Sequence, residues 1–282
     1  MFTIDYRHTQ ANLECGSPAP AFARVELAAA VKSGSPAPAL HKHQTRALQC
    51  CQTLKMPPKL PNIQACVFDA YGTLFNVNSA AQNAQDALGK NSQPLAELWR
   101  AKQLQYTWLR SLQGNYADFW QVTADALDFA LATLHLEDPA LRARLMNLYL
   151  TLSAYPEVSE TLQRLKATGI KLAILSNGSP AMLAAAAANA GIADLLDAIL
   201  SVDELQIYKP HPSVYALACQ RLNLPAANIC FLSSNGWDAY SAKSFGFRVL
   251  WCNRTNQAPE RIPETPDAQI ATLAELPDIV LG

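Results

Sequence analysis

The sequence has few charged residues, no long basic run and no long apolar stretch. Asp, Glu, Lys and Arg make up 16% of its 282 residues, and the formal net charge is -1. Nucleic acids and anionic membranes attract basic patches, so neither is expected as a partner. No apolar run reaches the roughly 20 residues that a membrane-spanning helix needs. The first residues lack a basic segment followed by an apolar one, so no secretory signal is predicted.

Several familiar catalytic signatures are also missing. The chain has no G-x-S-x-G elbow, no G-x-x-x-x-G-K-[ST] loop, no G-x-G-x-x-G fingerprint and no H-E-x-x-H motif. The 5 histidines are dispersed, so neither a histidine base nor a metal site is expected. The 7 cysteines form no C-x-x-C pair, and Cys66 and Cys230 lie in strand-like runs, where a free thiol acts as a small core residue. A reduced, cytoplasmic protein is therefore expected.

Residues 1–60 differ in composition from the rest of the chain. They carry GSPAPA twice, at 16–21 and 34–39, together with much Ala, Pro and Gln. Neither copy lies in an amphipathic unit. This composition predicts a flexible, disordered N-terminal extension without a core or a catalytic role.

From residue 63 onward, short apolar runs alternate with helical stretches. Runs that are apolar on both faces are typical of parallel strands covered on both sides. Ser179 followed by Pro180 predicts the start of one helix, and a second helix is predicted over 212–222. The alternation predicts an α/β fold with a doubly wound parallel sheet. The predicted strands are 63–68, 171–176, 197–201, 228–233 and 247–252.

The segment 79–152 contains no convincing strand. Leu98, Leu104 and Trp108 recur there at helical spacing. We therefore predict an all-helical insertion after the first strand, lying over the carboxyl edge of the sheet, where ligands bind in open α/β sheets. The predicted division is a core domain of residues 61–76 and 154–282 and a helical cap domain of residues 77–153.

Polar residues follow the predicted strands directly. Carboxyl ends of parallel strands share one edge, so these side chains should form a single site. Any one of them could instead cap a helix or a turn, but their common position at one edge favours a site. They are Asp69 and Thr73, then Ser176 and Asn177, then Lys209, and finally Ser233, Asn235 and Asp238.

Four blocks and one helical segment resemble the haloacid dehalogenase superfamily, and within it the L-2-haloacid dehalogenases, in order and spacing. The likeness runs from about Ile63 to Arg254 and leaves the extension outside. It implies a Rossmann-like core with an inserted helical cap. The matching segments are FDAYGTLF (68–75), LWRAKQLQYTWLRSLQGNY (98–116), LSNGS (175–179), YKPHPSVY (208–215) and SSNGWDAYSAKSFGF (233–247).

The residue at position 71 distinguishes the phosphatases from the dehalogenases of this superfamily. Its phosphatases carry a second Asp at this position, which protonates a leaving alkoxide. A halide leaves without a proton, and a tyrosine with a pKa near 10 is a poor acid at neutral pH. The last block has Asp238 as its only acid, whereas phosphatases hold Mg²⁺ there with an acidic pair. The pattern favours carbon–halogen cleavage without a metal or another cofactor.

The resemblance implies hydrolysis of short-chain (S)-2-haloacids to (R)-2-hydroxyacids and halide. Asp69 would attack C2 and form an ester, which water then hydrolyses. Lys209 would pair with Asp69, and Asp238 would orient the water. Thr73 and Tyr215 are the remaining positions matched to catalysis.

The resemblance assigns other positions to binding the substrate or to placing Asp238. Arg100 and Asn177 would meet the departing halide, and Ser176 would hold the substrate carboxylate. Phe119, Tyr71 and Trp237 would line the pocket, and Ser233 and Asn235 would help to place Asp238.

Two alternatives remain open. One is a superfamily phosphatase with an altered acid, and the other is a non-catalytic member that binds a carboxylate metabolite or a protein. An attacking carboxylate serves no purpose in a binding protein, which argues against the second. The expected partner is a small-molecule 2-haloacid, and a homodimer is the oligomeric state to test because dimers are common in the family.

Overall fold

The computed structural model describes residues 59–281, and the predicted extension lies outside these residues except for Lys59 and Leu60. Leu60 is buried, and its N–H donates a hydrogen bond to the carbonyl oxygen of Ile279 (3.0 Å). The chain is therefore anchored to the core from this residue onward. Among the described residues, no helix has the length and apolar character needed to cross a membrane.

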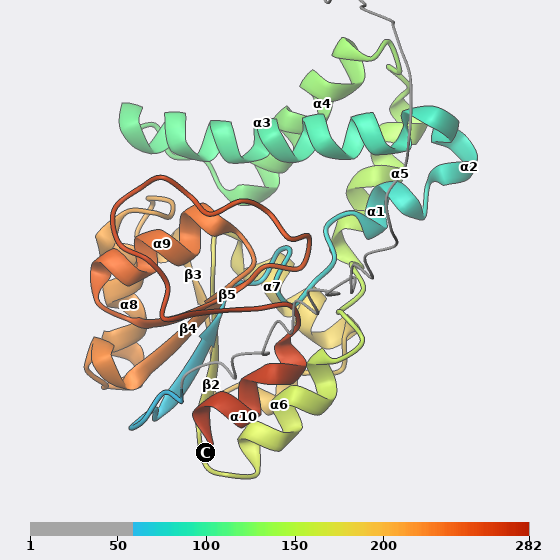
Figure 1. Ribbon diagram of the computed structural model, residues 1–282. Helices are drawn as coiled ribbons and strands as arrows, with labels where there is room; N and C mark the ends of the chain where they lie inside the picture. Colours follow the sequence, from blue (N-terminus) through green and yellow to red (C-terminus); the bar gives the residue numbers. More distant parts are fainter. Residues whose placement is uncertain (1–58, 282) are drawn as a thin grey trace, which may run out of the picture. The chain divides into compact units, whose positions relative to one another are not determined.

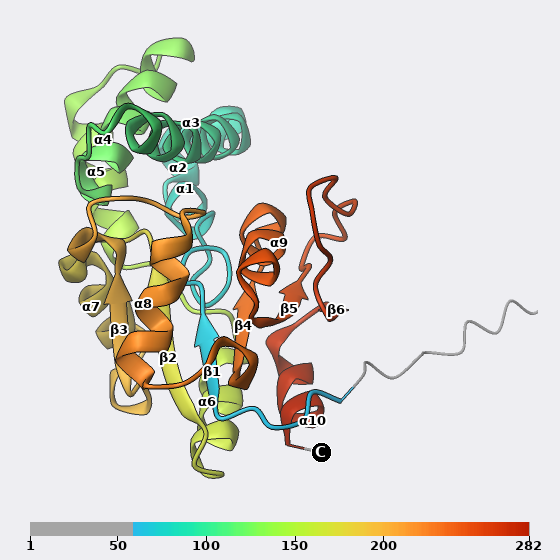
Figure 2. The same cartoon turned by 90° about the vertical axis from the view of Figure 1, so that its left-hand side faces the viewer.

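A parallel six-stranded sheet forms the centre of the described chain, with the strand order β3-β2-β1-β4-β5-β6 (Figure 2). The five predicted strands are confirmed, most of them shortened at the amino end. A sixth, very short strand at the edge was not predicted. The strands are β1 (Ala65–Phe68), β2 (Lys171–Ser176), β3 (Ala198–Ser201), β4 (Ile229–Ser233), β5 (Arg248–Cys252) and β6 (Ala268–Ile270).

The first strand lies in the middle of the sheet, which is why its carboxyl end can carry a site. Phe68, its last residue, is in register with Ile174 of β2 and Leu232 of β4. All residues of β1 are buried, because neighbouring strands flank both edges and helices cover both faces. The residue after Phe68 therefore emerges between the ends of two flanking strands.

Helices cover both faces of the sheet, as the doubly wound prediction requires (Figure 1). The helix predicted over 212–222 is confirmed with these bounds, and the helix after Ser179 begins at Pro180. One face carries α8 (Pro212–Leu222) and α9 (Gly236–Phe245). The other carries α6 (Val158–Lys166), α7 (Pro180–Asn189) and α10 (Leu276–Val280).

The segment between β1 and β2 is helical, as predicted, before it reaches α6. Two backbone hydrogen bonds tie its ends together: Asn76 N–H donates to Ser153 O (2.8 Å), and Tyr155 N–H donates to Leu74 O (3.0 Å). The division into domains at 76/77 and 153/154 stays a prediction. The helices of this segment are α1 (Ser79–Gln82), α2 (Gln85–Leu88), α3 (Ser92–Gln113), α4 (Phe119–Thr133) and α5 (Pro139–Leu150).

The long helix α3 buries a different stripe from the one that its apolar periodicity suggests. Its buried residues beyond the first turn are Leu95, Trp99, Gln103 and Thr107. Two of these are polar, and their hydrogen bonds are made inside the helical segment. The α3–α4 pair is the most extensive packing contact of this segment.

Candidate active site

The carboxylate of Asp69 is the centre of the predicted site. Asp69 directly follows β1, and its N–H donates to the carbonyl oxygen of Leu232 (2.8 Å), which continues the pairing with β4. The side chain is buried, with 8% of its surface exposed. Its Oδ1 accepts a hydrogen bond from Lys209 Nζ (3.1 Å), and its Oδ2 accepts from Thr73 Oγ1 (3.1 Å) and Asn235 Nδ2 (2.8 Å). Three donors thus hold the carboxylate in one orientation.

Lys209 connects two buried carboxylates. Its ammonium group also contacts Asp238 Oδ2 (2.9 Å), and both Lys209 and Asp238 are at most 1% exposed. Burial by itself lowers the pKa of Lys209, but attraction to Asp238 and Asp69 outweighs it, so the pKa is raised and the side chain stays charged. The two acids and one cation form a single charged cluster beneath the surface.

Asp238 lies in the first turn of α9 and has a second partner. Tyr215, on α8, donates its hydroxyl hydrogen to Asp238 Oδ1 (2.8 Å). Burial raises the pKa of Asp238, the charge of Lys209 opposes this rise, and the charge of Asp69 adds to it. Burial and the adjacent Asp238 raise the pKa of Tyr215 well above that of a free phenol. Tyr215 therefore remains a hydrogen-bond donor to Asp238.

The loop after Asp69 is fixed against the loop after β4. Thr73 Oγ1 accepts a hydrogen bond from the N–H of Ser234 (2.8 Å) and also contacts the Ser234 hydroxyl (3.1 Å). Gly72 has a φ of +92°, a conformation that favours glycine, and a Cβ there would lie 3.2 Å from Ser234 Oγ. The motif's glycine thus allows the two loops to approach each other.

Arg100 reaches this cluster from the helical segment. Its Nη2 donates to Asn235 Oδ1 (3.2 Å) and lies 3.4 Å from the carbonyl oxygen of Tyr71. Asn235 in turn donates to Asp69, so one amide side chain separates the guanidinium group from the carboxylate. A cation of the inserted segment is therefore held beside a carboxylate of the sheet.

Tyr71 and Phe119 form an aromatic wall. Their ring centroids are 5.6 Å apart, and Tyr149 of α5 stacks on Tyr71 at 5.5 Å. The Tyr71 side chain is buried, yet its hydroxyl has no hydrogen-bond partner within residues 59–281. Burial, and then the neighbouring Tyr149 and Asp69, raise its pKa well above the ordinary value. Gly178 makes room for this ring, because a Cβ there would lie 2.8 Å from Tyr71 Cε2.

Three of the predicted polar side chains bond to backbone rather than to Asp69 or Asp238. Ser176 Oγ accepts from Gly178 N–H (3.1 Å), and Asn177 Oδ1 accepts from Lys209 N–H (3.0 Å). Ser233 Oγ accepts from Asn235 N–H (3.2 Å), and this hydrogen bond lies within the loop after β4. Asn177 helps to place Lys209 through its main chain.

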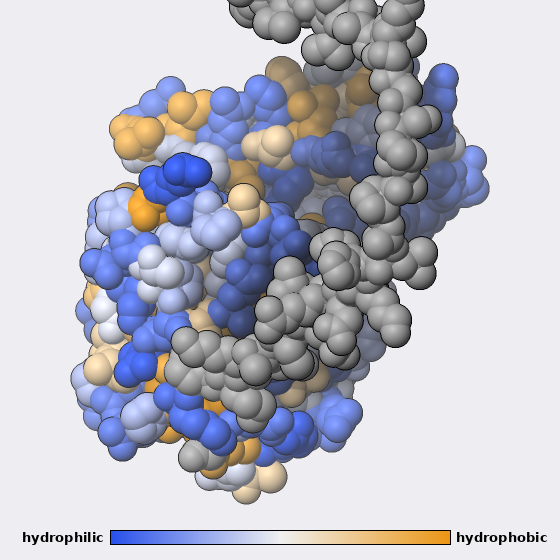
Figure 3. All heavy atoms as spheres, in the orientation of Figure 1, coloured by the Kyte–Doolittle hydropathy of each residue, from blue (hydrophilic) through white to orange (hydrophobic). Residues whose placement is uncertain are grey.

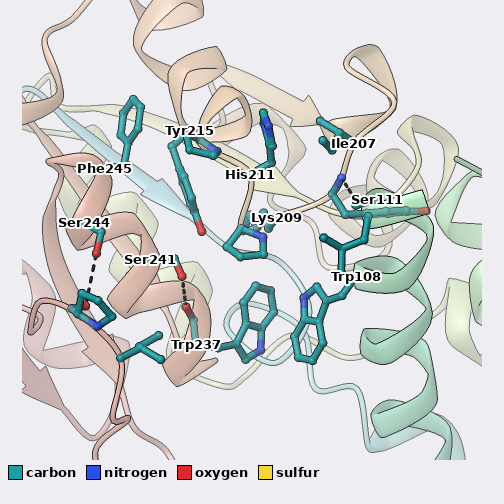
Figure 4. A pocket seen from close by; sticks show the side chains of 16 residues that line it. Trp108, Ser111, Ile207, Lys209, His211, Tyr215, Trp237, Ser241, Ser244 and Phe245 are labelled. Carbon is teal, nitrogen blue, oxygen red and sulfur yellow. Dashed lines mark hydrogen bonds between the residues drawn. The ribbon is translucent and has the colours of Figure 1, made fainter. Parts of the chain in front are cut away.

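Trp237 stands at the contact between α9 and α3. Its ring packs edge to face on Trp108, with centroids 5.4 Å apart (Figure 4). Neither indole N–H has an acceptor in the described part of the chain. Trp237 makes no hydrogen bond to the carboxylates, so it contributes a wall next to the cluster.

Several residues outside the predicted set also contact the site. Arg254 donates to the carbonyl oxygen of Thr73 (2.9 Å), and Ser234 bonds to the Thr73 side chain. Arg254 follows β5 by two residues, so the strand-end rule applied to that strand would have found it. Gln103 of α3 accepts a hydrogen bond from Arg100 (2.8 Å), and no local sequence signal marks this contact.

Within residues 59–281, no three His, Cys, Asp or Glu side chains are grouped so that they could hold a metal ion. The described cysteines Cys66, Cys219, Cys230 and Cys252 are free thiols.

The fold and the site define a class of α/β proteins in which a buried carboxylate follows the central first strand and a helical insertion supplies a cation beside it. A family model described as a haloacid dehalogenase-like hydrolase matches residues 63–246, and the chain belongs to this family.

Named relatives and solved structures agree with this assignment. The (S)-2-haloacid dehalogenase 4A of Burkholderia cepacia is 48% identical over 216 residues, which cover 76% of this chain and 94% of that protein. The (S)-2-haloacid dehalogenase 1 of Pseudomonas sp. (strain CBS-3) is 47% identical, covering 78% and 97%. The L-2-haloacid dehalogenase structure from Xanthobacter autotrophicus with chloropropionic acid covalently bound has a TM-score of 0.74 and 41% identity, covering 78% and 99%.

Proposed function

We propose that this protein is an (S)-2-haloacid dehalogenase that hydrolyses short-chain L-2-haloalkanoic acids to (R)-2-hydroxyacids and halide. The observation that carries the proposal is the pair of residues at the end of β1. Asp69 is a buried, firmly oriented carboxylate, and Tyr71 is a buried phenol whose raised pKa makes it a poor acid. A carboxylate without an acid beside it suits a leaving group that departs as a stable anion.

In the first step, a carboxylate oxygen of Asp69 attacks C2 of the acid. The C–O bond forms as the carbon–halogen bond breaks, and the halide leaves with the bonding electrons, so C2 is inverted. Lys209 holds one oxygen of Asp69, and Thr73 and Asn235 hold the other. The displacement needs no proton.

Groups around the reacting carbon are proposed to bind the halide and the substrate carboxylate. Arg100 supplies the positive charge for the growing halide charge, together with the amide of Asn177. The hydroxyl of Tyr71 is buried and lacks a partner within residues 59–281, so a bound anion can accept its hydrogen. Phe119 packs against Tyr71 and excludes water on that side, and Ser176 holds the substrate carboxylate.

In the second step, water attacks the carboxyl carbon of the Asp69 ester, and the 2-hydroxyacid leaves. Asp238 accepts a proton from the water, because burial raises its pKa and makes it a stronger base than an exposed carboxylate, and this proton then passes to the departing alkoxide oxygen. Tyr215 and Lys209 fix both of its oxygens. Attack at the carboxyl carbon leaves C2 untouched, so one inversion remains and an S substrate gives an R product.

The test is to incubate the full chain with each enantiomer of 2-chloropropionate in the presence of EDTA. Chloride released from the S enantiomer alone, with (R)-lactate as product, is expected. A single turnover in water enriched in ¹⁸O should place the label in Asp69 and not in the lactate. Absence of chloride from both enantiomers, in a folded sample, would overturn the proposal.

Metal independence, a cytoplasmic location and a homodimer belong to the same proposal. Retention of activity in EDTA tests the first. Light scattering during gel filtration tests the homodimer, for which the helical segment offers exposed Leu109 and Phe129.

A further inference from the structure

We propose that Phe231 is a positioning residue for the reaction, because the face of its ring holds the ammonium group of Lys209 in place between two carboxylates. The inference rests on the proposed function and adds a residue to its charged cluster. Phe231 lies in the middle of β4 and is fully buried. The Nζ atom of Lys209 lies over its ring, 5.0 Å from the ring centroid. A cation within about 6 Å of the centroid is attracted by the negative charge of the ring face.

The ammonium group of Lys209 carries three hydrogens, and its carboxylate partners account for two of them. The Nζ atom is 3.1 Å from Asp69 Oδ1 and 2.9 Å from Asp238 Oδ2. It forms no further hydrogen bond within residues 59–281. The Lys209 side chain is only 1% exposed, so bulk water does not compete for the third hydrogen. The ring face of Phe231 is therefore the contact that remains for it.

Neighbouring aromatic rings fix the orientation of Phe231. Phe247, of the segment just before β5, stacks on it with the centroids 5.7 Å apart and an angle of 19° between the ring planes. Tyr215 of α8 packs edge to face on it at 5.9 Å. Because Tyr215 also donates a hydrogen bond to Asp238, Phe231 touches two of the side chains that hold this carboxylate.

The ring and the ammonium group meet in a part of the fold that is shielded from water. Helices α8 and α9 cover this side of the sheet (Figure 1). The surface over them is mostly hydrophilic in Figure 3, as expected when their apolar side chains face the sheet. A cation–π interaction is stronger where the cation is desolvated than where it is exposed. The burial of Lys209 therefore favours a contribution from the ring.

The contact matters for the reaction because the charge of Asp69 changes during it. When Asp69 becomes an ester, it loses the negative charge that attracts Lys209. The attraction between the ammonium group and the Phe231 ring does not depend on that charge. The ring therefore keeps Lys209 in place beside Asp238 for the second step, and a small displacement of a positioned group can cost much of the rate.

The test replaces Phe231 with phenylalanines that carry one, two and three ring fluorines. Each fluorine makes the ring face less negative and weakens its attraction for a cation, with little change in the shape of the ring. We expect kcat for (S)-2-chloropropionate to fall stepwise, by roughly twofold to thirtyfold in total, the range of a cation–π interaction. The KM should change little, because the ring contacts Lys209 and not the substrate. The urea midpoint of unfolding is measured on the same proteins.

Phe247 is the matched control for this series. It is also fully buried, and it packs edge to face on Tyr215 at 6.0 Å, much as Phe231 does at 5.9 Å. Lys209 lies over the ring of Phe231 and not over that of Phe247. The same fluorinated residues at Phe247 should therefore leave kcat within about twofold of the wild-type value, below the effect of a buried cation–π contact.

The outcomes separate this proposal from the proposed function. A flat kcat series at Phe231, or an equal decline at Phe247, overturns the positioning role and leaves the dehalogenase function standing. A lower urea midpoint at Phe231 with unchanged kcat also overturns it, because the contact would then stabilise only the fold. Failure of the wild-type protein to release chloride overturns the proposed function, and the positioning role with it.

Discussion

Arg100 and Gln103 are one turn apart on α3, and the Arg100 Nη1 donates to Gln103 Oε1 at 2.8 Å. The Gln103 amide is buried, and its Nε2 donates to Thr123 Oγ1 (2.7 Å), whose own hydrogen goes to Phe119 O (2.6 Å). This chain of donors fixes which way the amide points, because Thr123 Oγ1 must act as the acceptor. The oxygen of Gln103 is therefore directed at Arg100.

Replacing Gln103 by Leu should reduce turnover more than it reduces stability. Arg100 loses a fixed acceptor, and hydrogen bonds to charged groups contribute about 1.5–3 kcal/mol, so kcat for 2-chloropropionate should fall by roughly tenfold to a hundredfold. Gln105→Leu is the matched control, since Gln105 is exposed on the same helix. Equal activity of the two variants would show that Gln103 does not position Arg100.

Tyr71→Phe should lower kcat/KM without lowering the stability of the fold. The hydroxyl is buried without a partner in the described chain, so removing it should leave the melting temperature unchanged or slightly raised. If the hydroxyl donates to a bound anion, kcat/KM falls by roughly tenfold to a hundredfold, the value of a hydrogen bond to a charged group. Thermal unfolding and halide release are measured side by side. A destabilised variant with normal kcat/KM would contradict the expected role.

Lys209→Met should destabilise the protein and abolish turnover. Asp69 and Asp238 would lose the cation that contacts both, and removing one partner of a buried ion pair costs about 3–5 kcal/mol. Because the folded pKa of Lys209 is raised, its stabilisation is full below the unfolded pKa of about 10.4 and disappears as pH rises through the folded pKa.

Urea unfolding of wild type and Lys209→Met, from neutral to alkaline pH, measures this difference. The difference should be constant up to about pH 10 and shrink above it. Adding Asp238→Asn should restore part of the stability, because one uncompensated buried charge is removed. A neutral-pH difference below about 1 kcal/mol, the range of an exposed pair, would count against a coupled buried cluster.

Asp267 lies outside the candidate active site, and its ion pairs predict how the stability of the fold changes at acid pH. Burial by itself raises the pKa of Asp267, but hydrogen bonds from Lys243 and the N–H of Val249, with the charges of Lys243 and Arg248, outweigh it and lower the pKa. Its stabilisation is therefore present above the unfolded pKa of about 3.9 and lost as pH falls through the folded pKa. Asp267→Asn should cost about 1–2 kcal/mol at neutral pH.

The cost should decrease below about pH 4, as measured by urea unfolding across the acid range. Asp278→Asn is the control, because its pair with Arg164 is exposed and should contribute at most about 1 kcal/mol. A pH-independent cost for Asp267→Asn would show that packing, and not the charge, is responsible.

The buried strands and the catalytic motif could be predicted because their signals are local. β1, β2 and β4 are continuous apolar runs, and the polar residues that follow them are read directly from the chain. The three-residue strand β6 could not be predicted from the sequence. An edge strand of this length carries no apolar run and is defined by its pairing with β5. The same limit applies to α3, where Leu104 and Trp108 supply the apolar period while Gln103 and Thr107 lie buried.

The sequence by itself determined the α/β architecture, the turn that carries Asp69 and the presence of Tyr71 two residues later, since each depends on residue type at short spacing. Only the tertiary structure decided which side chains complete the site. Gln103, Ser234 and Arg254 approach it from distant segments, and Ser233 Oγ accepts a hydrogen bond within its own loop. The physical reason is that most buried polar groups need a hydrogen-bond partner, and these partners lie on segments that are distant in the sequence and meet only in the folded chain.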